Sequence, residues 1–131
     1  MDKVKSRYKT SEAIDSIAKK LNLKYDKSCQ DWAYEIADST LIDKYYKVYD
    51  LLDNQDEKFV LMQTIIQATN DLIDSTGNLD LWPRLEQKLI VDFQIHEHTI
   101  DYWSCFDSNN LNDCWVITEK MRDLFKSQNG K

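Results

Sequence analysis

Glycine and proline are almost missing from this chain, which contains Gly77, Gly130 and Pro83 and no others. Sandwiches and barrels make many tight turns, and tight turns use both residue types, so this scarcity disfavours an all-β fold. It also excludes glycine-rich phosphate loops and the G-x-S-x-G nucleophile motif, because each needs closely spaced glycines. The composition instead suits helices joined by polar turns.

Long apolar runs are missing too. No stretch approaches the roughly 18 residues of a membrane span, and the N-terminus lacks the apolar segment of a signal peptide. We therefore expect a cytoplasmic protein that contacts no membrane. The three cysteines, Cys29, Cys105 and Cys114, are an odd number without C-x-x-C spacing. This pattern fits reduced thiols, used mainly for packing, better than a disulfide framework or a zinc site.

Basic residues are scarce in the second half of the chain. The 131 residues carry a net charge of −6, and no Lys or Arg lies between Lys88 and Lys120. The carboxylates in that window are Asp92, Glu97, Asp101, Asp107, Asp113 and Glu119. Such a charge distribution should repel nucleic acid and attract a basic protein.

Apolar residues recur at helical spacing in six segments. We expect helices at about 11–22, 29–37, 40–53, 55–75, 80–106 and 119–127. Residues suited to helix ends flank them: Thr10, Asn54 and Asp80 at N-terminal caps and Gly77 at a C-terminal end. No repeat or linker divides the chain. The sequence therefore predicts one all-α domain over 1–131, an irregular antiparallel bundle with flexible ends at 1–9 and 127–131.

The segment 80–106 is expected to be the long central helix of this bundle. On a helical wheel its first apolar stripe contains Trp82, Leu85, Leu89, Phe93, His96, Ile100 and Trp103. A second stripe, nearly opposite, contains Val91, Ile95, Tyr102 and Phe106. Because a surface helix needs only one apolar face, two stripes predict packing from two sides. A continuous helix would span about 39 Å, so a break near 96–101 is compatible with the pattern.

The two histidines, His96 and His98, cannot bind one metal ion from the same helix, because they point about 160° apart. Asp92 lies one turn before His96 and could orient it as a general base or a metal ligand. The place of His96 in the apolar stripe favours a structural role instead. We predict no metal, no cofactor and no catalytic residue. A small enzyme using Asp92 and His96 stays open as an alternative, as does a regulatory or scaffold subunit that dimerises through 40–53.

Aromatic residues stand beside carboxylates near the end of the 80–106 segment. The candidate partner-binding residues are Glu97, Asp101, Asp107, Asp113 and Trp115. Charge steering combined with an aromatic anchor is suited to binding a basic protein. The alternative is that these carboxylates only keep the surface soluble.

Several stretches together resemble small helical bacterial immunity proteins of polymorphic or contact-dependent toxin systems. They are W-A-Y-E-I-A-D, E-K-F-V-L-M, L-I-V-D-F-Q-I-H, D-Y-W and W-V-I-T-E-K-M-R, which extend over most of 31–125. The resemblance implies a non-enzymatic inhibitor that neutralises a cognate toxin domain, such as a nuclease, in the cytoplasm. It assigns no site residues, because such families diverge at their binding faces.

Overall fold

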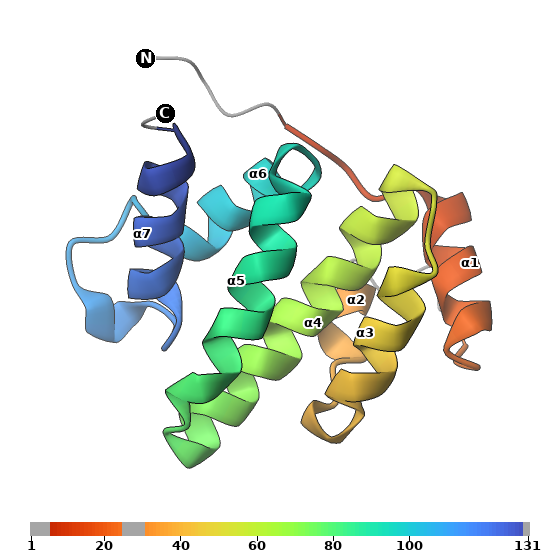
Figure 1. Ribbon diagram of the computed structural model, residues 1–131, viewed down its shortest axis with the longest axis horizontal. Coiled ribbons are helices and arrows are strands. Elements are labelled where there is room, and N and C mark those ends of the chain that lie inside the picture. The colour runs from red at the N-terminus through yellow and green to blue at the C-terminus, as the bar shows by residue number, and fades with distance from the viewer. Residues whose placement is uncertain (1–5, 25–30, 130–131) are drawn as a thin grey trace. The chain divides into compact units, whose positions relative to one another are not determined.

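The computed structural model describes residues 6–24 and 31–129 (Figure 1). All regular secondary structure in the described ranges is helical and none of it is β-strand, which confirms the all-α prediction. The α-helices are α1 (Ser11–Lys20), α2 (Trp32–Glu35), α3 (Ile42–Asp50), α4 (Gln55–Thr76), α5 (Trp82–Val91), α6 (Phe93–Ser104) and α7 (Thr118–Asn129). Three 3-10 helices, η1 (Ser39–Leu41), η2 (Leu79–Leu81) and η3 (Leu111–Asp113), lie between them.

The chain forms two compact units. The N-terminal unit contains Tyr8–Thr69. The C-terminal unit contains the described residues from Asn70 to Asn129, together with Ser6 and Arg7. The boundary falls inside α4, which is the longest helix of the described chain with 22 residues. All the residues proposed above for partner binding belong to the C-terminal unit.

Helix ends follow the local signals in the sequence. The Thr10 side chain accepts a hydrogen bond from the backbone N–H of Ala13, and the Asn54 side chain accepts one from Glu57. These oxygens satisfy N–H groups that have no partner inside their own helix. Gly77 follows the last residue of α4 with φ +72°, a conformation that residues with a Cβ rarely adopt. The predicted helix ends at Thr10, Asn54 and Gly77 are confirmed.

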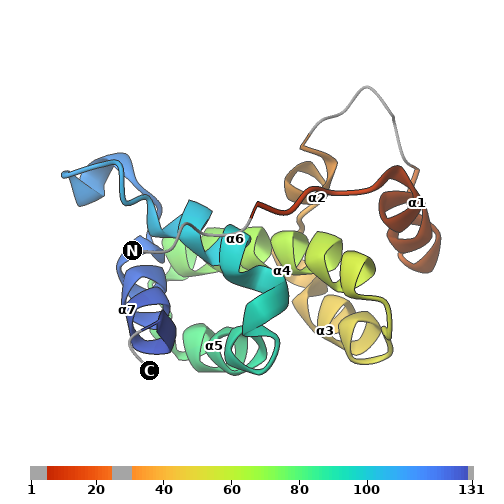
Figure 2. The ribbon, with the colours of Figure 1, turned by 90° about the horizontal axis from the view of Figure 1, so that it is seen from above.

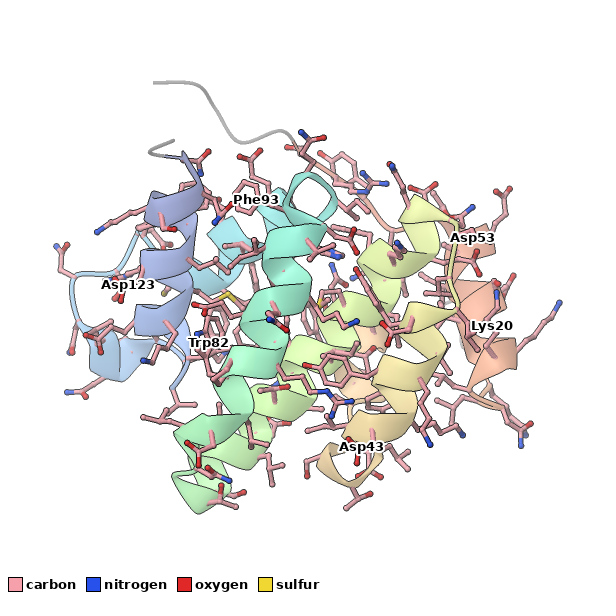
Figure 3. All side chains as sticks on the ribbon, in the orientation of Figure 1. Lys20, Asp43, Asp53, Trp82, Phe93 and Asp123 are labelled. Atoms are coloured by element: carbon pink, nitrogen blue, oxygen red, sulfur yellow. The ribbon has the colours of Figure 1, made fainter. Side chains whose placement is uncertain are left out.

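Polar contacts join helices within the N-terminal unit. The buried Thr64 hydroxyl on α4 donates to the carbonyl oxygen of Ala33 on α2 at 2.6 Å. At the start of α4, Glu57 accepts hydrogen bonds from Ser16 and Lys20 of α1, with Lys20 Nζ at 2.5 Å (Figure 3). Apolar side chains of α1, α2, α3 and α4 form the core around these contacts: Ile17, Trp32, Tyr45, Phe59, Leu61 and Ile65.

The prediction that 80–106 forms one long helix is wrong. Asp92, with φ −109° and ψ 33°, separates α5 from α6 (Figures 1 and 2). The break lies before the expected 96–101 region. Asp80 also does not cap a helix: η2 precedes α5, and the Asn78 side chain accepts a hydrogen bond from the Asp80 N–H. Helix α5 starts at Trp82, with Pro83 in the first turn, where a missing N–H costs nothing.

The break explains why two apolar stripes occur in one segment. Each of the two helices buries a single face: Trp82, Leu85 and Leu89 of α5, and Ile95, His96, Thr99, Ile100 and Trp103 of α6. Most of the expected second stripe is instead exposed, namely Val91, Tyr102 and Phe106. Only Ile95 from that stripe is buried, so the prediction that this segment is packed from two sides is also wrong.

Helix α7 packs against α6 and completes the C-terminal unit. Asn70, in the last part of α4, accepts a hydrogen bond from the Ile117 N–H just before α7. The helix continues to Asn129, three residues into the tail expected to be flexible, and Asp123 lies on its exposed side (Figure 3). No helix in the described ranges has the length and apolar character needed to cross a membrane.

Candidate protein-binding surface

The loop 105–117 joins α6 to α7 and projects from the helices of its unit (Figure 2). Helix α6 ends at Cys105, whose φ of 53° turns the chain sharply away from the helix axis. Farther along, the Asn110 side chain accepts a hydrogen bond from the Asn112 N–H and so starts η3. The polar stretch 107–113 therefore lies in a loop, with a short 3-10 turn inside it.

Arg122 of α7 holds the first part of this loop in place. Its Nε donates to the Ser104 carbonyl oxygen at 2.6 Å, and its Nη2 donates to those of Cys105 at 2.6 Å and Ser108 at 3.0 Å. The last carbonyl groups of a helix lack partners within it and carry partial negative charge, so a guanidinium is well suited to this position. The Arg122 guanidinium also lies 5.7 Å from the ring centroid of Phe106.

Thr118 and three aromatic rings hold the second part. The buried Thr118 hydroxyl donates to the Trp103 carbonyl oxygen at 3.0 Å and accepts from the Trp115 N–H at 3.1 Å. The Trp115 ring lies 4.4 Å from the ring of Trp103 and 5.2 Å from that of Tyr102, between centroids. Trp115 is half-buried, so part of the predicted aromatic anchor packs within the unit.

The four predicted carboxylates occupy α6 and this loop. Glu97 and Asp101 lie one turn apart on α6 and are half-buried, whereas Asp107 in the loop and Asp113 in η3 are exposed. Within the part of the chain that the structure describes, none of the four forms an ion pair with Lys or Arg. Arg122, the basic residue that holds this loop, donates its hydrogen bonds to backbone carbonyls rather than to these carboxylates.

Large apolar side chains are exposed between these carboxylates. Tyr102, Phe106, Leu111 and Val116 expose between 43% and 53% of their surface. Single exposed apolar residues are ordinary, but several within one short segment and beside charges are typical of protein-binding surfaces. We define the acidic–apolar surface as these four residues together with Glu97, Asp101, Asp107, Asp113 and Trp115.

The four apolar members were not identified as binding residues from the sequence. The helical pattern places Tyr102 and Phe106 on a buried stripe, because it does not indicate the break at Asp92. A signal for Leu111 was present: it is a lone large aliphatic residue within the polar stretch D-S-N-N-L-N-D. Such a residue has no helical neighbour to pack against and is a candidate for an external contact.

The alternative catalytic pair has a different environment. His96 is fully buried, and its backbone N–H donates to the Asp92 carbonyl oxygen at 3.2 Å. A general base must reach a proton on bound substrate, which a fully buried ring does not do. The described residues also contain no group of three or more His, Cys, Asp or Glu side chains able to hold a metal ion. The burial of the His96 ring favours its structural role.

No family model, curated protein or solved structure matches this chain. The function is therefore inferred from the residues and geometry of the acidic–apolar surface. The likeness to immunity proteins stays a prediction.

Proposed function

We propose that the protein is a non-enzymatic inhibitor of the immunity type, which neutralises a basic cognate toxin domain by binding it through the acidic–apolar surface. The observation that carries this proposal is the alternation of exposed apolar side chains with carboxylates that lack Lys or Arg partners among the described residues. Tight interfaces combine a buried apolar centre with complementary charge around it. The loop 105–117 offers both on one short segment.

The two kinds of residue have different tasks. The carboxylates raise the rate of encounter with a positively charged partner, and this effect weakens as salt screens the charges. The apolar side chains provide affinity when the partner covers them, at about 1.5–3 kcal/mol for each fully buried Leu or Val side chain. Arg122 and Thr118 hold the loop before binding, which reduces the entropy lost when the complex forms.

A basic partner suggests the mode of inhibition. Domains that act on nucleic acid carry Lys and Arg in their substrate sites, because they neutralise phosphates. A carboxylate-rich loop placed over such a site competes with the phosphates for the same cations. We therefore infer that a nuclease-type toxin domain is the partner, and that this protein itself binds neither nucleic acid nor a membrane.

Removing two apolar members of the surface tests the proposal. The L111S/V116S protein is expected to capture at least about tenfold less of the partner than the native sequence, since each substitution removes more than about 1 kcal/mol of apolar contact. The measurement is a tagged pull-down from the host's lysate at low salt. It is eluted by a salt step and quantified by mass spectrometry.

The matched control is L51S/V91S, which removes two other apolar side chains, 83% and 79% exposed. This variant should capture the same basic protein as the native chain. Equal capture by L111S/V116S, or capture of acidic proteins only, would argue against the proposed surface.

A further inference from the structure

Cys105 and Cys114 lie at the two ends of the loop that carries η3, with their Sγ atoms 2.8 Å apart. Both are free thiols and both are half-buried, rather than fully buried packing residues as the sequence suggested. Cys29 lies outside the described residues. The separation of the two sulfurs exceeds the ~2.05 Å bond of a disulfide by only roughly 0.8 Å.

The backbone on both sides of the pair is anchored to α7. Arg122 binds the carbonyl of Cys105 itself and that of Ser108. Thr118 binds the N–H of Trp115, the residue directly after Cys114. The short distance between the sulfurs is thus maintained by contacts outside the two side chains.

The backbone conformation of Cys105 also indicates that surrounding contacts hold this residue in place. Its φ of 53° is in the left-handed region, which is uncommon for a residue with a Cβ. Conformations of this kind persist where surrounding contacts fix them, and they concentrate at functional positions. Here the turn brings the Cys105 side chain back toward Cys114.

We propose that Cys105 and Cys114 are a modification site, at which a low-molecular-weight disulfide of the glutathione type converts the two thiols into a reversible intramolecular disulfide. One cysteine thiolate attacks a sulfur of the small disulfide, forming a mixed disulfide and releasing one small thiol. The second cysteine, after losing its proton to solvent, attacks the protein sulfur of that mixed disulfide and releases the other small thiol. Two electrons and two protons pass to the small disulfide.

The pKa of the Cys105 thiol is raised chiefly because Cys114 lies close to it. The hydrogen bond with Cys114, followed by burial and by the negative charges of Cys114 and Asp107, raises the pKa of Cys105 to about 11, while Arg122 acts in the opposite direction. Because the neighbouring sulfur is the largest cause, the two thiols form one interacting pair rather than two independent groups. The raised pKa keeps Cys105 in its thiol form near neutral pH, so its thiolate becomes more abundant as the pH rises.

The modification would change the loop that bears the acidic–apolar surface. A bond between residues 105 and 114 closes a short ring that includes Asp107, Leu111 and Asp113. The ring restricts the conformations open to these side chains. The proposal does not depend on the proposed inhibitor function, because its test is the formation of the bond itself.

The test uses the full-length C29S protein, in which only the proposed pair remains. The protein is equilibrated in glutathione redox buffers, free thiols are blocked with N-ethylmaleimide, and intact mass is measured. We expect a product that has lost two hydrogen atoms, carries no maleimide and forms at a rate independent of protein concentration. The C29S/C114S control should stop at a mixed disulfide with glutathione.

The same titration in concentrated urea measures what chain proximity alone provides, which for a short flexible loop is an effective concentration in the millimolar range. The effective concentration of the two thiols in the folded protein should exceed that measured in urea by at least about 100-fold. A folded-state value equal to or below the urea value would overturn the proposal, as would a product that is an intermolecular dimer or only a mixed disulfide.

Discussion

Replacing Arg122 with methionine is expected to lower the free energy of unfolding by about 3 kcal/mol, since hydrogen bonds to charged groups contribute about 1.5–3 kcal/mol each and are not fully additive. The substitution keeps much of the apolar stem but removes all three bonds from the guanidinium to the Ser104, Cys105 and Ser108 carbonyls. It leaves the C-terminal end of α6 without its cation and releases the first half of the loop.

Urea denaturation followed by circular dichroism measures this change, with K120M as the matched control. Lys120 is exposed on the same helix, so its replacement removes an equal charge without removing these bonds. The control should shift stability by no more than about 0.5 kcal/mol. If R122M unfolded at the same urea concentration as K120M, the role given to Arg122 in holding the loop would be wrong.

Reversing two charges on the acidic–apolar surface is expected to weaken binding of the captured partner about 100-fold. In D101K/D107K, two attractions become two repulsions, and each reversal costs about 1–1.5 kcal/mol in total near a protein surface. Most of the lost affinity should appear as a slower association rate, and the association rate of the native protein should fall as salt is raised. Surface plasmon resonance at two salt concentrations measures both quantities.

The control for this prediction is D53K/D74K, which changes the net charge by the same amount. Asp53 precedes α4 (Figure 3). Asp74 lies in the last turns of that helix, and both residues are exposed. Its association rate should stay within about threefold of the native rate, because neither residue belongs to the acidic–apolar surface and exposed charges act over only about 10 Å at 0.1 M salt. Equal losses in the two variants would indicate an effect of net charge rather than of this surface.

Local signals in the sequence were sufficient for part of the fold. Thr10, Asn54 and Gly77 mark helix ends correctly because capping depends on the residue type at one position and on neighbours within one turn. The break at Asp92 had no such signal. Apolar periodicity is consistent with one helix or with two helices related by a small rotation, and Asp92 is compatible with both.

The contacts that build the surface depend on tertiary structure. Arg122 binds backbone carbonyls 14 to 18 residues earlier, and backbone acceptors leave no trace in residue type. The predicted carboxylates are correctly placed on one helix and its following loop, but their apolar neighbours depend on the turn at Cys105. The pairing of Cys105 with Cys114 depends on the same turn and so could not be read from spacing.

The central claim is that residues 97–117 form the binding surface, and hydrogen–deuterium exchange with the captured partner tests it most directly. Exchange is measured by mass spectrometry on the free protein and on the protein saturated with partner. The account predicts that slowed exchange is concentrated in the last turns of α6, in the loop 105–117 and at the start of α7. Slowed exchange confined to residues 11–69, with 97–117 unchanged, would contradict it.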